Sequence, residues 1–368
     1  MAKQGMGRRQ FLDLLLRGTA AATMAVSGLD CTAQKQDSMH DSHDISDVVG
    51  QKQSEQAYTA DKEVNHLTHL LVDWAESYNA SAAQDPNTGK TVQEKLESAA
   101  TFGETIDLDV RAAVEIYDTP LSNPTDYLAK QARSAKTMET LLDQGIVFSV
   151  GYSLNGDDRS EISLGIVAKD GRTARKTEKG RQYEQVVYTN IIDNHFDHDA
   201  QGEAIIRRQC FRRQDKVYMD LEHVDRTSNY LQRVGKKISQ KGADNFAEQM
   251  YLEAYQQLET AARENKTSFV HEYRLMIQTT VLDHHEPEHF NHELDMPREE
   301  KEKQAYLKEI AEGNHRGKPY NALTLATLAD CNFVPDFFEF FASKDALARM
   351  NPKERSELAK IKFKEVYE

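Results

Sequence analysis

The sequence predicts an α+β fold with N-terminal helices, a small antiparallel sheet and a C-terminal helical part. Two observations lead to this prediction. Apolar residues recur at helical spacing before residue 143 and after residue 225, whereas the stretch between them is rich in β-branched and aromatic residues and in turn signals. A chain of 368 residues with 39% hydrophobic content can bury a substantial core. We expect residues 61–368 to form a single α+β domain.

Helices are expected on the N-terminal side of the sheet. The apolar series from Val64 to Tyr78 predicts an amphipathic helix over 61–82. Two more helices are predicted over 91–102 and 125–143, the second of which ends before Gly145.

The sheet is expected between residues 146 and 222. Asn155-Gly156 is a strong hairpin signal because both residues tolerate the positive φ angles of a tight turn. An antiparallel sheet of about four strands follows from this pattern. The predicted strands cover 146–154, 161–168, 182–193 and 216–222.

The remainder of the chain, from about residue 225 to residue 368, returns to helical periodicity. Asn351, Pro352 and Glu354 match the cap, first-turn and capping-box positions of the final helix. The predicted helices cover 226–240, 243–264, 267–282, 298–312, 320–330 and 352–367.

The N-terminus carries a paired arginine followed by a mildly apolar stretch. The segment around Arg8 and Arg9 (GRRQFL) resembles the twin-arginine signal peptides of exported proteins. The resemblance implies removal of residues 1–33 and a periplasmic or extracellular location. Residues 34–60 are polar, nearly free of aromatic residues and rich in Ser, Asp and Gln, which predicts a disordered tether. A lipid anchor on Cys31 is not expected, since the preceding residues do not form a lipobox.

The charge balance limits the classes of partner. The chain has 46 basic and 60 acidic residues, so it would repel a nucleic-acid backbone, and we expect no nucleic-acid partner. No apolar run reaches the roughly 18 residues that a transmembrane helix needs, so no transmembrane segment is expected. In an oxidising compartment Cys210 and Cys331 could form a disulfide or remain two buried thiols, and the sequence leaves both alternatives open.

One helical segment carries a chemical motif, from Phe269 to Gln278 (FVHEYRLMIQ). It resembles the HExxH helix of the zincin metallopeptidases, in particular the gluzincin branch. In that family two histidines four residues apart bind zinc, and the glutamate beside the first accepts a proton from water. A later helix contributes a glutamate ligand, which Glu302 resembles. The resemblance implies a zinc cofactor held by His271 and Glu302, Glu272 as the catalytic base, and a peptide or protein substrate.

The motif departs from the family at Leu275, which stands where the second histidine ligand belongs. Three explanations are open: the chain is a pseudo-enzyme, a downstream histidine replaces the missing ligand, or the match is accidental. The downstream histidines are His284, His285, His289 and His292.

A second segment matches HExxH letter for letter, from His285 to His289 (HEPEH). If Pro287 opens a helix, His285 lies before it in non-helical geometry and the two imidazoles need not converge. We therefore treat this match as a decoy for peptidase chemistry. The surrounding residues 283–293 could still bind Zn²⁺, Cu²⁺ or Ni²⁺, or form a flexible polar loop. His195 and His198 form a smaller cluster, for which we favour a structural interpretation.

Two functions therefore remain in view. The first is an exported, zincin-like protein related to zinc metallopeptidases, either active or inactivated by Leu275. The alternative is a non-catalytic envelope protein, for binding or structure, with a histidine-rich metal-binding loop. The sequence leaves open whether the chain is an enzyme.

Overall fold

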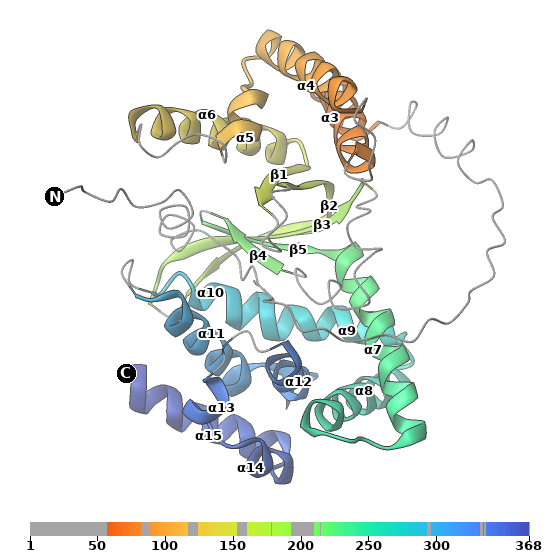
Figure 1. The fold of residues 1–368 in the computed structure, drawn as a ribbon, viewed down its shortest axis with the longest axis vertical. Helices are drawn as coiled ribbons and strands as arrows, with labels where there is room; N and C mark the ends of the chain where they lie inside the picture. Colours follow the sequence, from red (N-terminus) through yellow and green to blue (C-terminus); the bar gives the residue numbers. More distant parts are fainter. Residues whose placement is uncertain are drawn as a thin grey trace. The chain divides into compact units, whose positions relative to one another are not determined.

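The computed structural model describes most of the chain after residue 56, and Figure 1 shows its elements. The predicted signal peptide, Cys31, the Asn155-Gly156 turn and the His195/His198 cluster lie outside the described residues, as does most of the predicted tether. Described are residues 57–81, 88–116, 124–152, 160–192, 210–292 and 296–367, apart from 178, 214, 332, 333 and 335.

The chain divides into two compact units, where the sequence predicts one domain over 61–368. Among the described residues, the N-terminal unit contains 57–166 and 191–192, and the C-terminal unit contains 167–190 and 210–367. The physical reason is that the buried apolar residues form two clusters, one in each unit, instead of one continuous core.

The N-terminal unit is built from helices and one strand pair. Its helices are α3 (Lys62–Ser81), α4 (Thr88–Thr105), α5 (Val110–Glu115) and α6 (Pro124–Asp143). The fully buried Leu67, Leu71 and Trp74 place the apolar stripe of α3 in this core, as the periodicity predicts. Tyr58, within the predicted tether, is also buried, and its backbone N–H donates to the side chain of Asn65.

The sheet has five strands in the order β1-β2-β3-β5-β4. The predicted α+β class is confirmed, but the sheet is mixed and not wholly antiparallel, because β5 pairs parallel with β3. The added edge strand β4 pairs antiparallel with β5, and this hairpin inserts β5 beside β3. The strands are β1 (Ile146–Tyr152), β2 (Ser160–Lys176), β3 (Gln182–Asn190), β4 (Cys210–Arg213) and β5 (Lys216–Asp220).

Helices make up most of the C-terminal unit. Asp220 at the end of β5 accepts from the backbone N–H of Glu222 and so caps the first helix after the sheet. The segment formed by α9, η4 and α10 packs against the sheet strands of the same unit (Figure 1). The first elements are α7 (Leu221–Lys241), α8 (Phe246–Asn265), α9 (Phe269–Ile277), the π-helix η4 (Gln278–His285) and α10 (Glu286–Glu288).

The rest of this unit supplies the elements that surround that segment. A short hairpin of β6 (Asn314–His315) and β7 (Lys318–Pro319) turns at Arg316 and Gly317, whose φ angles are 53° and 74°. The helices are α11 (Arg298–Glu312), α12 (Ala322–Cys331), α13 (Phe337–Phe340), α14 (Lys344–Arg349) and α15 (Pro352–Tyr367).

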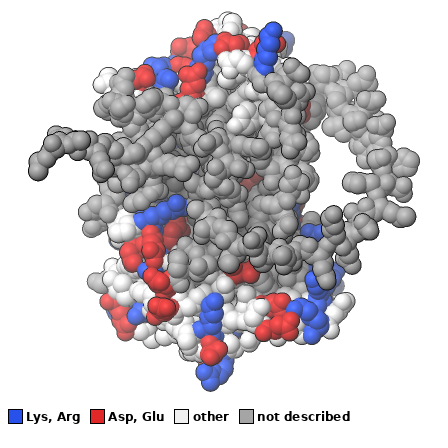
Figure 2. All heavy atoms as spheres, viewed as in Figure 1, with Lys and Arg blue, Asp and Glu red and all other residues white. Residues whose placement is uncertain are grey.

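Two further features bear on the expected partners. In the part of the chain that the structure describes, no helix combines the length and apolar character that crossing a bilayer requires. Figure 2 shows one face of the molecule, on which the described Lys and Arg side chains are interspersed with Asp and Glu.

Cys210 is a free, buried thiol, and burial raises its pKa well above the usual value.

Candidate metal centre

The helical segment over 269–288 carries both His-Glu pairs of the sequence. It begins where the Ser268 hydroxyl accepts from the backbone N–H of His271. The segment then widens into the π-helix η4 and continues through α10, so it runs beyond the predicted end at residue 282. His285 has helical angles of φ −66° and ψ −61°.

The expectation that Pro287 places His285 outside a helix is therefore wrong. The π-helical turns change which carbonyls face the proline: the backbone N–H of Glu286 donates to Val281, five residues earlier. Pro287 lies in the short turn after these wide turns, and His289 follows in the same helical rotation. The HEPEH segment, treated as a decoy, thus has the geometry that an HExxH motif requires.

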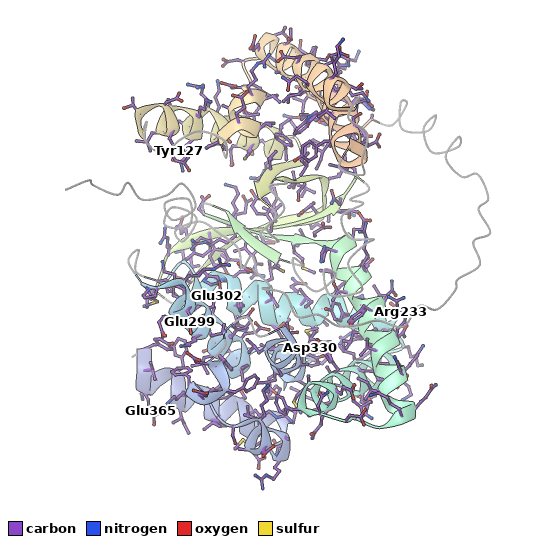
Figure 3. All side chains as sticks on the ribbon, viewed as in Figure 1. Tyr127, Arg233, Glu299, Glu302, Asp330 and Glu365 are labelled. Atoms are coloured by element: carbon purple, nitrogen blue, oxygen red, sulfur yellow. The ribbon has the colours of Figure 1, made fainter. Side chains whose placement is uncertain are left out.

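His285, His289 and Glu302 form a group that could hold a metal ion. One ligand atom from each residue lies within 4.8 Å of the other two. The Oε2 atom of Glu302 is 3.7 Å from Nε2 of His285 and 3.9 Å from Nε2 of His289. Glu302 comes from α11, labelled in Figure 3 beside the segment that bears the histidines. In a tetrahedral zinc site such atoms would be about 3.3 Å apart, so only small side-chain rotations separate this group from a ligand shell.

Burial and unpaired atoms test whether the residues fit an ion. The side chains of His285, His289 and Glu302 are 3%, 5% and 14% exposed. The Nε2 atom of His289 and the Oε2 atom of Glu302 are buried and have no hydrogen-bond partner among the described residues. Leaving buried polar atoms unpaired is costly, and a bound cation is one means of satisfying them. Two imidazoles and a carboxylate are the ligand set of many catalytic zinc sites, so the residues fit zinc.

Outer contacts orient both histidines. The Nδ1 atom of His285 is 3.0 Å from Oε2 of Glu309, a contact with the distance of a hydrogen bond but not its angles. The other carboxylate oxygen of Glu309 accepts from the Thr324 hydroxyl at 2.6 Å. The Nδ1 atom of His289 lies 3.3 Å from Nδ1 of His292. In each ring Nδ1 lies beside a neighbouring side chain and Nε2 lies toward Glu302, an arrangement that is usual for metal-binding histidines.

The pKa values reflect this crowding of buried ionisable groups. Burial lowers the pKa of His285, but the Glu309 carboxylate more than offsets it and raises the pKa to about 9. Burial and the nearby His285 push the pKa of His289 well below its usual value. Burial also raises the pKa of Glu302. Without an ion, His285 therefore carries the positive charge that the carboxylates attract.

Glu286 is the carboxylate that occupies the second position of HEPEH. It is 1% exposed, and burial raises its pKa to about 7 against the opposing effect of His285. Its Oε2 atom is buried and has no hydrogen-bond partner among the described residues. A carboxylate with a pKa near neutrality can accept a proton and release it again, as a general base must.

The site residues selected from the sequence, His271, Glu272 and Glu302, do not all belong to this group. Of that set, Glu302 is in the metal-binding group, whereas His271 is exposed at the start of α9 and is not part of it. Glu272 is fully buried, and its two carboxylate oxygens accept from the Arg316 guanidinium at 2.6 and 3.1 Å. Thr267 donates to the same carboxylate at 2.5 Å. These bonds occupy Glu272, which makes it a structural ion-pair partner and a poor candidate for a base.

The pKa of Glu272 reflects these bonds. The Arg316 guanidinium, working against burial and helped by the Thr267 hydroxyl, lowers its pKa to about 2. His315 lies 2.8 Å from the same carboxylate. A group with this pKa stays ionised at neutral pH and does not exchange protons there.

Sequence reasoning did not select His285, Glu286 and His289 as site residues, although the HEPEH letters were the signal that could have identified them. It kept His285 and His289 only among the histidines that could replace the missing ligand, and it set the HEPEH match aside because of the proline. Comparison with protein-family models finds no match, and comparisons with curated proteins and with solved structures find none either.

Proposed function

We propose that this protein is a metal-dependent hydrolase whose zinc site is formed by His285, His289 and Glu302, with Glu286 as the general base. The observation that supports it most is the convergence of three ligand atoms within 4.8 Å of one another. A second buried carboxylate, that of Glu286, follows His285 in the sequence, and its Oε2 atom has no hydrogen-bond partner among the described residues. Three protein ligands leave the fourth position of a tetrahedral ion open, as in catalytic zinc sites. With these ligands, Leu275 no longer stands at a ligand position.

In the proposed hydrolysis, the bound zinc and Glu286 have different roles. When bound, zinc would act as a Lewis acid that lowers the pKa of water and polarises a carbonyl oxygen. Glu286 would accept a proton from water as the water oxygen adds to the carbonyl carbon of the substrate. Glu286 would then donate that proton to the leaving nitrogen as the C–N bond breaks. A peptide substrate is proposed from the resemblance of HEPEH to the zincin motif.

The test combines metal analysis with a base-less variant. Wild-type protein should contain stoichiometric zinc and hydrolyse a mixed peptide library, detected by mass spectrometry. Glu286→Gln should keep the zinc and lower the hydrolysis rate by about 10²–10⁴-fold. Glu288→Gln changes a second buried glutamate in the same turn, whose carboxylate accepts from Asn291 and Gln304, and should keep both properties. Equal hydrolysis by wild type and Glu286→Gln would exclude the assigned base.

A second candidate is a non-catalytic metal-binding protein, and one observation favours it. The three ligand side chains are at most 14% exposed, and closed sites are typical of structural zinc. In that case the same experiment would give stoichiometric zinc and no hydrolysis. Zinc removal would then lower the melting temperature without any loss of activity.

We also propose that the protein is exported through the twin-arginine pathway. The support is the Arg8-Arg9 signature, which lies outside the described residues. Substituting both arginines by lysine should leave a full-length precursor in the cytoplasm, checked by fractionation and by the mass of the chain. Unchanged distribution of the double variant would contradict the proposal.

A further inference from the structure

The hydrogen-bond pattern of the π-helix is interrupted at Pro287. Glu286 donates its backbone N–H to Val281, a five-residue spacing. The next bond of that spacing would join residue 287 to the carbonyl of Leu282. Proline has no N–H, so this bond cannot form. Leu282 is fully buried, and its carbonyl needs another donor.

Gln185 on β3 supplies that donor. Its Nε2 atom lies 3.0 Å from the carbonyl oxygen of Leu282 and 2.8 Å from Oδ1 of Asp283. The side chain is 2% exposed, and its Oε1 atom accepts from Arg175 at 3.1 Å, which fixes the orientation of the amide. Gln185 therefore does for Leu282 what an ordinary residue at 287 would do.

The sheet also holds the other end of the motif. Arg212 on β4 donates to the carbonyl of His289 at 2.7 Å. Gln185 acts before the proline and Arg212 acts after it, so the backbone that carries both histidines is anchored to neighbouring strands. This arrangement matters because ligand atoms must be held within a few tenths of an ångström of their positions.

We infer that Gln185 is a positioning residue for the metal centre, which stabilises the π-helical turns that bring His285 and His289 onto one face. The inference rests on the proposed function. Its physical basis is a competition between two hydrogen-bond patterns. Without the amide, the Glu286 N–H can move to Leu282 in a four-residue α-helical spacing. That spacing turns the Pro287 ring against the carbonyl of Asp283 and rotates His285 relative to His289.

The test is a rescue between two substitutions on different elements. Gln185→Met removes the donor while keeping the side-chain length, and it should weaken zinc binding about tenfold or more, measured by competition with a chromophoric chelator. Pro287→Ala restores a backbone N–H at the position that should serve Leu282. The double variant Gln185→Met/Pro287→Ala should therefore recover most of the lost affinity, although it carries more changes.

A matched control separates this effect from general damage to the sheet. Gln249→Met removes another glutamine, whose amide donates to the carbonyl of Ala348 on the C-terminal side of the unit, and should leave the zinc affinity unchanged. Wild-type affinity in Gln185→Met would overturn the inference, and so would a double variant that binds no better than Gln185→Met.

Failure of the proposed function is distinguishable from failure of this inference. Wild-type protein that binds no zinc would contradict the function. Wild type, Gln185→Met, Pro287→Ala and the double variant can then be unfolded by urea in the absence of metal. Restored stability in the double variant would support the coupling of Gln185 to Pro287, and additive losses would overturn it.

Discussion

The two His-Glu pairs of this chain lie fourteen residues apart on one continuous helical segment, yet their surroundings differ in kind. At His271-Glu272 the histidine is exposed and the carboxylate is neutralised by Arg316 from the β6–β7 hairpin. At His285-Glu286 both side chains are buried, and the Glu286 carboxylate has an oxygen without a hydrogen-bond partner among the described residues. The pKa of Glu272 is about 2 and that of Glu286 about 7.

The difference shows that identical dipeptides acquire their chemistry from the elements packed against them. An arginine makes Glu272 part of the scaffold, because its charge and hydrogen bonds are fully used. At Glu286, by contrast, burial opposes ionisation, and among the described residues the Oε2 atom has no hydrogen-bond partner. Four experiments test this contrast.

The largest effect is expected from removing one histidine of each pair. His289→Ala deletes a ligand with a buried, unpaired Nε2 atom, and it should abolish stoichiometric zinc binding. His271→Ala alters an exposed residue and should retain zinc at the wild-type level. Metal content after dialysis measures both. Retained zinc in His289→Ala together with lost zinc in His271→Ala would restore the assignment made from the sequence.

A smaller effect is expected from the carboxylate that orients His285. Glu309→Gln removes the negative charge 3.0 Å from Nδ1 and should weaken zinc binding by about 10–100-fold. Glu312→Gln, one turn further along α11, changes a carboxylate paired with His284 and Lys308, which are outside the metal-binding group. Chelator competition should show near wild-type affinity for this control, and equal losses in the two variants would argue against a role for Glu309 in orientation.

The smallest effect is expected at the ion pair of Glu272 with Arg316 and concerns the free energy of unfolding. Arg316→Ala leaves the buried Glu272 carboxylate without its main partner and should lower the free energy of unfolding at pH 7 by more than the control below. Arg274→Ala breaks a more exposed ion pair with Asp225 and should cost less than about 1 kcal/mol. Urea unfolding curves of the three proteins provide the comparison.

The acid dependence of the same pair has a defined sign. The folded-state pKa of Glu272 is about 2, below its ordinary value of 4.5, so the pair stabilises the fold fully above pH 4.5. That contribution is lost as the pH falls from 4.5 toward 2. The difference in unfolding free energy between wild type and Arg316→Ala should therefore shrink over this window. A difference that stays constant between pH 7 and pH 3 would contradict the pKa assignment.

Most elements were predictable because their patterns are local. The helix predicted over 298–312 coincides with α11, and the final helix begins at its predicted cap. Short elements were missed, among them α5 and β4, because four to six residues carry too little periodicity to identify. The parallel pairing of β3 with β5 was also missed, because strand order depends on contacts between distant parts of the chain.

Local pattern was enough to establish the α+β class, most helices and the presence of two HExx-like segments in the chain. It was misleading about which segment has the geometry of an HExxH motif, because the rule for proline assumes α-helical hydrogen bonding. Only the folded chain shows that a π-helix precedes Pro287, that Gln185 satisfies Leu282 and that Arg316 occupies Glu272. Each of these contacts joins residues far apart in the sequence or departs from the usual helical spacing, so neither periodicity nor motif matching could reveal it.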